Sequence, residues 1–367
     1  MNSSPDILFE RRGTAGIVIL NRPHALNAVT HVMVRALAEQ LVTWADDAAV
    51  TRVIVMAAGT RAFSAGGDLK AIYELGRSGR YDDALTFWWD EYRLNALIKR
   101  YRKPYVALID GVVMGGGAGI SINGSHRVAG DAFRFAMPEV GIGFFPDVGA
   151  TWFLPRLPGE LGTYCAFTGD RLEAADGLGC GIATHRVRSA RFIELIEGLC
   201  GAVPVDAVLA AFTEPTDAGA LMRQRPAIDR WFKANRVEDL LANLEMDAAE
   251  PGDDGDLARR LAATIKAKSP LSLKLALALQ RRGRTLAFDE CMRTEYRVVS
   301  RVVRGHDFYE GIRAVIIDKD QGPNWQPPAL AAVSEAEVER HFAPVTRELD
   351  LPELDLPKID LPKIDLP

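Results

Sequence analysis

The chain has 367 residues, of which 48% are hydrophobic and 25% are charged, and both values are typical of globular proteins. The formal net charge of −5 argues against a nucleic-acid binder, which would normally carry a basic excess, but it allows a local basic pocket for an anionic ligand. At roughly 100–200 residues per domain, the length predicts one large domain or two, with a core that needs neither disulfides nor metal.

Neither a membrane span nor a targeting segment is predicted. No run reaches the roughly 18 apolar residues that a span requires, and a strand-like run that starts at Ile7 leaves no room for a cleaved leader. The spacing of the four cysteines matches neither a metal pair nor a dense disulfide framework, so we expect thiols in a reducing cytoplasm. The cysteines are Cys165, Cys180, Cys200 and Cys291.

Short strands and helices alternate in the first half of the chain. Apolar, β-branched runs indicate the strands, and apolar residues at helical spacing indicate the helices, so α/β layering is expected. The predicted strands cover residues 16–20, 52–57, 104–109 and 133–136, and the predicted helices cover 32–44 and 82–100.

From about residue 204 the pattern becomes helical, over 205–244 and 257–306. Pro270 after Ser269 indicates a helix start, because the first turn does not use the N–H that proline lacks. We therefore divide the chain into an α/β core over 1–205, a helical region over 206–345 and a tail over 346–367.

The tail repeats a five-residue unit with one proline in each copy, beginning at Leu351, Leu356 and Leu361. Proline at this spacing prevents a regular helix or a central strand. An extended or disordered arm is predicted, and docking against a neighbour is the alternative.

Two loops, residues 62–69 and 111–117, are rich in glycine. Neither has the Gly-Lys-Ser/Thr of a phosphate-binding loop, and residues 114–119 do not read GxGxxG. Without Cβ atoms, N–H groups from two loops can converge on one oxygen, as in an oxyanion hole, and a helix starting near Gly117 would add its positive end. Two tight turns are the alternative.

Two acids stand in an unusually apolar segment. Glu139 follows Met137-Pro138, and Asp147 lies in Phe144-Phe145-Pro146-Asp147-Val148-Gly149. Taken singly, Glu139 could be a surface turn residue and Asp147 a helix cap. Together they suggest a lined pocket in which desolvation would raise a carboxyl pKa.

These segments together resemble the crotonase (enoyl-CoA hydratase/isomerase) superfamily, over residues 21–342. Its broad motifs match three segments, and narrower matches point to its 3-hydroxyisobutyryl-CoA hydrolase branch. The broad motifs are Ala25-Leu26-Asn27, residues 63–69 and Met114-Gly115-Gly116-Gly117; the narrower ones are residues 135–139, 143–149, 153–157, 304–308 and 313–320. The resemblance implies a crotonase-like spiral of ββα units followed by a helical C-terminal region, and it leaves open whether the chain is a monomer or a homo-oligomer.

The resemblance also assigns roles to residues. The oxyanion donors fall on the N–H groups of Gly67 and Gly116, the central catalytic carboxylate on Glu139 and the second carboxylate on Asp147. A further pocket glutamate falls on Glu91, which the residues alone would make an exposed helix residue. The implied CoA contacts are His24, Ala25, Leu26, Ala65, Gly66, Asp68 and Leu69.

One departure separates the chain from the hydratases of the family. They carry a glutamate two residues after the Gly-Gly-Gly loop, where this chain has Gly119, and usually a glycine where Asp147 stands. The resemblance therefore implies hydrolysis of a short branched 3-hydroxyacyl-CoA, foremost 3-hydroxyisobutyryl-CoA from valine breakdown. No metal or other cofactor is expected, since CoA arrives with the substrate, and neither nucleic acid nor membrane is an expected partner. An enoyl-CoA hydratase or isomerase and a non-catalytic acyl-CoA-binding scaffold are the alternatives.

Overall fold

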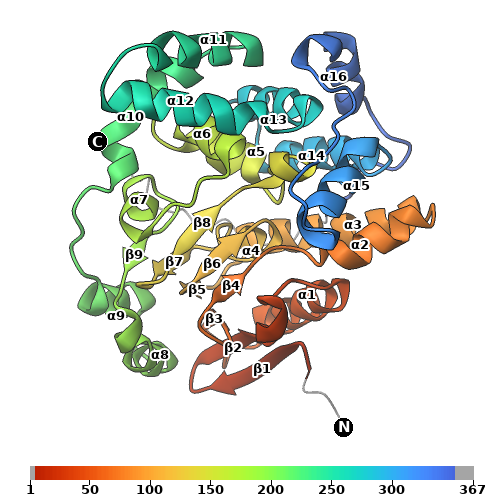
Figure 1. Cartoon of the computed structure of the whole chain (residues 1–367). Helices are drawn as coiled ribbons and strands as arrows, with labels where there is room; N and C mark the ends of the chain where they lie inside the picture. The colour runs from red at the N-terminus through yellow and green to blue at the C-terminus, as the bar shows by residue number, and fades with distance from the viewer. Residues whose placement is uncertain (1–4, 352–367) are drawn as a thin grey trace.

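Two sheets form the centre of the fold in the computed structural model, which describes residues 5–351 (Figure 1). In the larger sheet β1 pairs antiparallel with β2, and the strands that follow are parallel. The large sheet has the order β1 (Ile7–Arg12), β2 (Ala15–Leu20), β3 (Arg52–Ala57), β5 (Tyr105–Ile109), β7 (His126–Ala129) and β9 (His185–Arg186), and the small parallel sheet has the order β4 (Ala62–Ser64), β6 (Val112–Met114) and β8 (Arg134–Ala136).

The chain winds as a spiral between the two sheets. β3, β5 and β7 join the large sheet, and the next strand in each case, β4, β6 or β8, joins the small one. This confirms the predicted α/β spiral of ββα units. Residues 62–64 and 112–114 were expected within loops but form the strands β4 and β6, because these three-residue runs are stabilised by pairing with each other and, for β6, with β8, rather than by a pattern of their own.

The large sheet is buried on both faces, as parallel sheets usually are. Val53 and Val55 point into the main core, whereas Ile54 joins a second cluster that covers the other face. Two helices, α8 (Phe192–Cys200) and α9 (Val205–Phe212), supply Leu199 and Leu209 to that second cluster (Figure 1).

Three helices of the first half pack together, with α1 (His31–Asp46) and α2 (Leu69–Arg77) both against α3 (Tyr81–Lys99). Of these, α1 and α3 were predicted from their spacing. Thr30 caps α1 by accepting a hydrogen bond from the Met33 N–H.

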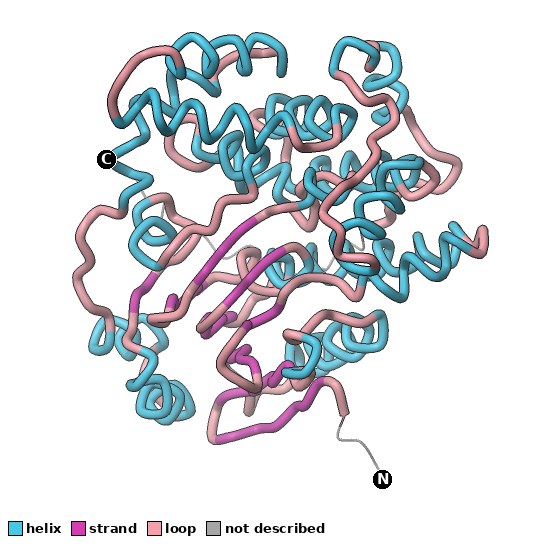
Figure 2. Tube along the Cα trace, viewed as in Figure 1, coloured by secondary structure: helices cyan, strands magenta, loops and turns pink. Residues whose placement is uncertain are grey.

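The second half is helical, as predicted, and packs on the spiral (Figure 2). Ser269 caps α13 by accepting from the Ser272 N–H, and Phe232 packs edge-on against Tyr164 of the core, 5.7 Å between ring centroids. The division at residue 205 stays a prediction. The helices of this half are α10 (Ala220–Phe232), α11 (Val237–Ala248), α12 (Asp253–Lys266), α13 (Pro270–Gly283), α14 (Phe288–Val302), α15 (His306–Ile312) and α16 (Glu335–Phe342). Shorter helices of the first half are α4 (Gly116–Gly119), α5 (Ala150–Phe153), α6 (Leu161–Thr168) and α7 (Ala174–Gly179).

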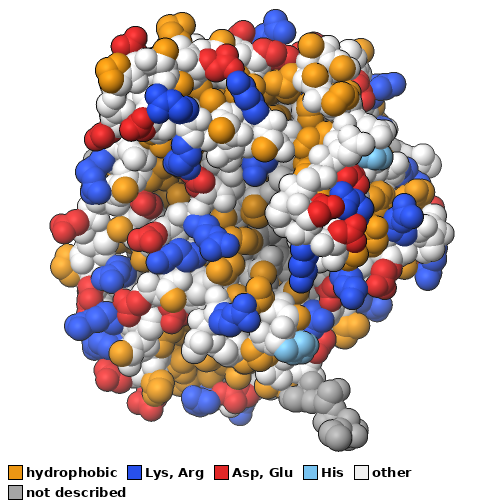
Figure 3. Space-filling view, in the orientation of Figure 1, with side chains coloured by type: hydrophobic (Ala, Val, Ile, Leu, Met, Phe, Trp, Pro, Cys, Tyr) orange, Lys and Arg blue, Asp and Glu red, His pale blue; other side chains and the backbone are white. Residues whose placement is uncertain are grey.

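After α16 the chain runs without regular structure to Leu351, and the side chains of Leu349 and Leu351 are buried. Residues 352–367 of the predicted tail lie outside the described residues. Basic and acidic side chains are interspersed on the face of the molecule in Figure 3. Within residues 5–351, no helix is long and apolar enough to cross a membrane.

Candidate active site

The site is assembled where the three strands of the small sheet end. Gly66 and Gly67 follow β4, Gly115 and Gly116 follow β6, and Glu139 follows β8. Because β4, β6 and β8 are parallel, their carboxyl ends meet at one edge of the sheet, which is where open α/β sheets hold their ligands. Residues spread over about seventy positions thereby become neighbours.

The two glycine loops approach each other closely. A Cβ atom at Gly116 would lie 3.2 Å from the Gly67 nitrogen and 2.5 Å from Oε1 of Glu91, so a side chain there would occupy the space between the loops. Gly115 has a φ of 46°, which favours glycine, and its Cβ would lie 3.2 Å from Oε1 of Glu139. Within the described chain, neither the Gly67 N–H nor the Gly116 N–H has a protein acceptor.

Glu139 opens a short 3₁₀ segment, Glu139–Ile142, and its side chain is buried. The interpretation of this residue as a surface turn is therefore wrong. Burial, followed by repulsion from Asp147, raises the pKa of Glu139 well above its usual range. Its Oε2 atom is buried without a hydrogen-bond partner among the residues described, so it is available to a substrate or a water.

Asp147 is fixed by α3. The Tyr92 hydroxyl donates to Oδ2 of Asp147 at 2.8 Å. Burial raises the pKa of Asp147 to about 7, and hydrogen bonds, including those from Tyr92 and Trp88, partly oppose this rise. The alternative of a helix cap is wrong, because α5 begins at Ala150 and the position before it is Gly149, which has no side chain to cap the helix.

Glu91 lies one turn before Asn95 on the buried face of α3. Its side chain is only 2% exposed, so the interpretation as an exposed helix residue is wrong. Burial raises the pKa of Glu91 well above its usual range, and repulsion from Asp147 is the second cause of this rise. Spacing along a helix could not identify the buried face here, because α3 is covered on most of its surface.

Sequence reasoning missed Glu295, a fully buried acid on α14. Its two carboxyl oxygens accept from the N–H groups of Gly149 and Thr151, each at 2.9 Å, so it holds the backbone that follows Asp147. Burial and repulsion from Asp147 raise the pKa of Glu295 to about 8. The sequence did hold one signal for its burial: Glu295 lies at helical spacing from Met292 and Val299, and so on the same apolar face of α14.

The residues implied to contact CoA form one continuous edge. The Ala65 N–H donates to the Leu26 carbonyl at 3.0 Å, and Val29 bridges to Gly67, so the segments 24–26 and 65–69 lie together. Asp68 accepts from Arg22 at 3.1 Å, and His24 is exposed beside this edge. CoA binding by these residues stays a prediction.

At Gly119 there is no room for the second glutamate that hydratases of the crotonase superfamily carry at this position. A Cβ atom at Gly119 would lie 2.7 Å from Nδ2 of Asn95 and 2.8 Å from Cβ of Val148. A glutamate at this position would require both neighbours to move. The arrangement thus offers two carboxyl groups at the glycine loops, Glu139 beside Gly115 and Glu91 beside Gly116, with Asp147 close enough to raise the pKa of both.

Two close glycine loops next to buried carboxyl groups, in an α/β spiral, are an arrangement typical of acyl-transfer sites, and the roles of the individual residues stay predictions. The chain belongs to the enoyl-CoA hydratase/isomerase family, whose profile matches residues 15–342.

Among its relatives, the chain is 44% identical to a mitochondrial 3-hydroxyisobutyryl-CoA hydrolase of Danio rerio over 92% of this chain and 89% of that protein. It is 39% identical to the human protein of the same name, over 93% of this chain and 89% of that one. It is 38% identical to 3-hydroxyisobutyryl-CoA hydrolase 1 of Arabidopsis thaliana, over 96% and 95%.

Two solved structures are similar in fold and sequence. One is described as a carnitinyl-CoA dehydratase from Mycobacterium thermoresistibile, with a TM-score of 0.89, 42% identity and coverage of 95% of this chain and 99% of that one. The other is described as an enoyl-CoA hydratase from Rhodobacter sphaeroides, with a TM-score of 0.86, 36% identity and coverage of 93% and 98%.

Proposed function

We propose that this chain hydrolyses 3-hydroxyisobutyryl-CoA to 3-hydroxyisobutyrate and CoA, a step of valine breakdown. The observation that carries the proposal is the buried Glu139 beside the two glycine loops, with the buried Asp147 near enough to raise its pKa. Relatives named for this activity match more than nine-tenths of the chain. A cytoplasmic location stays a prediction, since several of those relatives are named mitochondrial proteins.

In the proposed reaction, the thioester oxygen lies between the N–H groups of Gly67 and Gly116. Negative charge develops on this oxygen in the tetrahedral intermediate, and fixed donors stabilise it more than they stabilise the neutral carbonyl. The loss of one such donor costs roughly 3–4 kcal/mol of barrier in comparable sites.

Glu139 has one of two roles. As a general base it takes a proton from water while the water oxygen attacks the carbonyl carbon, and it returns that proton to the CoA sulfur when the C–S bond breaks. As a nucleophile its oxygen attacks the carbonyl and expels CoA, and water then hydrolyses the mixed anhydride. Both routes consume one water and require ionised Glu139, whose raised pKa makes it a stronger base than an exposed carboxylate.

Asp147 is proposed to bind the 3-hydroxyl group of the substrate. A four-carbon acyl chain offers little apolar surface, so its hydroxyl must supply much of the selectivity. A site built around a hydroxyl rejects analogues without one, because its buried polar groups are then left unpaired. Tyr92 orients Asp147 for this contact by the hydrogen bond to Oδ2.

The second candidate is an enoyl-CoA hydratase or isomerase that uses Glu139 alone or with Asp147. The two solved structures reported above are described as a dehydratase and a hydratase, which favours this candidate. The closed space at Gly119 opposes it, because two-acid addition of water to a double bond then lacks its usual second acid.

Glu139→Gln tests the proposal. We expect the variant to lose nearly all CoA release from 3-hydroxyisobutyryl-CoA while it still binds CoA, because an amide neither accepts a proton nor attacks the carbonyl. The matched control is Glu335→Gln, an exposed glutamate at the start of α16. Wild-type turnover by purified Glu139→Gln would end the assignment.

A further inference from the structure

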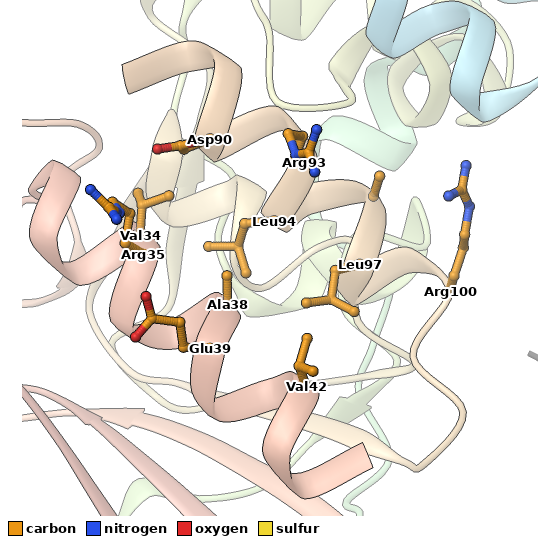
Figure 4. Close-up of a pocket in the computed structure, with 11 residues that line it drawn as sticks. Val34, Arg35, Ala38, Glu39, Val42, Asp90, Arg93, Leu94, Leu97 and Arg100 are labelled. Atoms are coloured by element: carbon orange, nitrogen blue, oxygen red, sulfur yellow. The ribbon is translucent and has the colours of Figure 1, made fainter. Parts of the chain in front are cut away.

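A groove with an apolar floor runs between α1 and α3, and Figure 4 shows the side chains of the two helices converging on it. Val42 lies in this groove and is 50% exposed. The floor is formed by Val34, Ala38, Val42, Leu94 and Leu97, and the rim by Arg35, Glu39, Asp90, Arg93 and Arg100.

The end of the described chain leads into this groove. The guanidinium of Arg347 lies over the Trp89 ring, 3.8 Å from its centroid. Three residues later, the Asp350 carbonyl accepts from Nη1 of Arg93 at 3.0 Å, and its carboxylate lies 3.7 Å from the same group. The chain therefore runs along α3 in the direction of the helix, and at Asp350 it has reached a residue of the groove rim.

The sequence that follows can place apolar side chains on one face. Each repeat has Leu at its first position and Leu or Ile at its fourth, as in Leu351 and Leu354. An extended polyproline helix has three residues per turn, so these two positions point to the same side. Leu351 is already buried against the core, which sets the face that Leu354 would continue.

The length and the charge of the tail segment can also be compared with those of the groove. From Arg93 to Arg100 the helix rises about 10 Å at 1.5 Å per residue, and residues 352–355 span about 12 Å at 3.1 Å per residue in the extended form. Residues 352–356 carry two acids, Glu353 and Asp355, and the groove rim carries three arginines and two acids. Of these rim residues, Arg93 already pairs with Asp350, Arg100 with Asp289 and Asp90 with His31.

We propose that residues 352–356 dock in the α1–α3 groove of their own chain, with Leu354 between Ala38 and Leu97. The proposal goes beyond the thioester chemistry and does not depend on it. Because the segment is tethered directly at the groove rim, its effective concentration is in the millimolar range, so even a weak contact keeps the groove occupied.

Disulfide trapping in the full chain tests this docking. The pair Val42→Cys and Leu356→Cys places one thiol at the end of the groove and one on the tail. The control pair, Val32→Cys with Leu356→Cys, uses another exposed valine of α1 that does not line the groove. We expect the groove pair to form an intrachain disulfide at least roughly tenfold faster than the control pair, because docking raises the local thiol concentration. Peptide mapping identifies which cysteines are joined.

Leu354→Asp in the groove pair should slow the reaction to the control rate, whereas Leu354→Met should leave it unchanged. These substitutions lie outside the described fold and so leave the groove itself unchanged. Equal rates for both pairs, or no effect of Leu354→Asp, would overturn the proposal. Disulfide-linked dimers in place of the intrachain product would also overturn it, since they would place the tail on a second copy.

Discussion

Burial dominates the chemistry of individual residues at this site. Glu91, Glu139, Asp147 and Glu295 are each less than a tenth exposed, and burial is the largest cause of the raised pKa of each. Hydrogen bonds lower the pKa values of Glu139, Asp147 and Glu295 and so partly oppose the effect of burial. Removing a single donor should therefore shift the pH dependence of activity.

Tyr92→Phe tests this dependence. The Tyr92 hydroxyl donates to Asp147 and lowers its pKa, so its loss should raise that pKa above about 7. The acid limb of the pH profile of kcat/KM should move to higher pH. The matched control is Tyr105→Phe, which removes a buried hydroxyl bonded to the Ile120 carbonyl. An unmoved limb in Tyr92→Phe would show that Asp147 is not the group that titrates.

Gly116→Ala tests the oxyanion site. The added Cβ would crowd Glu91 and the Gly67 nitrogen, at 2.5 and 3.2 Å, and would displace one donor. We expect kcat to fall by roughly a hundredfold or more, as expected for the loss of one donor. Gly201→Ala is the control, because its Cβ would meet no atom closer than 3.3 Å. A folded Gly116→Ala variant with unchanged kcat would remove these donors from the mechanism.

The alignment of short elements determines which residues meet at the site. Spacing alone predicts α1, α3 and the buried strands, because their apolar residues recur over ten positions or more, or form unbroken runs. β4 has three residues and no period of its own, so its place depends on its partner β6. Glu295 could not be assigned for the same reason: its partners, Gly149 and Thr151, lie some 145 positions earlier in the chain.

Glu295→Gln tests how α14 supports the loop of Asp147. A glutamine offers one acceptor and one NH₂ group to two N–H donors, so one buried N–H loses its partner. We expect the free energy of unfolding to fall by about 1–3 kcal/mol, with a loss of kcat on 3-hydroxyisobutyryl-CoA. Glu290→Gln is the control on the same helix, where the glutamate is exposed and pairs with Arg293. Equal stability of the two variants would contradict the supporting role.

At the scale of the whole molecule, the buried acids make stability depend on pH in an unusual direction. The pKa of Asp147 rises on folding from 3.8 to about 7, so between these values the folded chain holds a proton that the unfolded chain has released. The free energy of unfolding contributed by this group therefore falls as pH rises from about 4 through about 7. The same sign holds for Glu295, up to about pH 8.

Asp147→Asn should flatten this loss of stability. For the wild type, the free energy of unfolding measured with urea should be lower at pH 8.5 than at pH 5. Part of this decrease, on the order of a few kcal/mol, should be absent in the variant. Asp217→Asn, at an exposed aspartate, should behave like the wild type. A wild-type pH dependence in Asp147→Asn would mean that Asp147 does not carry the proton.

The most direct measurement supplies the wild-type protein with two thioesters in separate reactions and follows both possible products. One substrate is 3-hydroxyisobutyryl-CoA, and the other is the enoyl-CoA obtained from it by loss of water. Release of CoA is read with a thiol reagent, and loss or gain of the double bond by its absorbance. We predict rapid, irreversible release of CoA from the saturated 3-hydroxyacyl thioester and little addition of water to the enoyl thioester. Reversible addition of water without release of CoA would contradict the account and identify a hydratase.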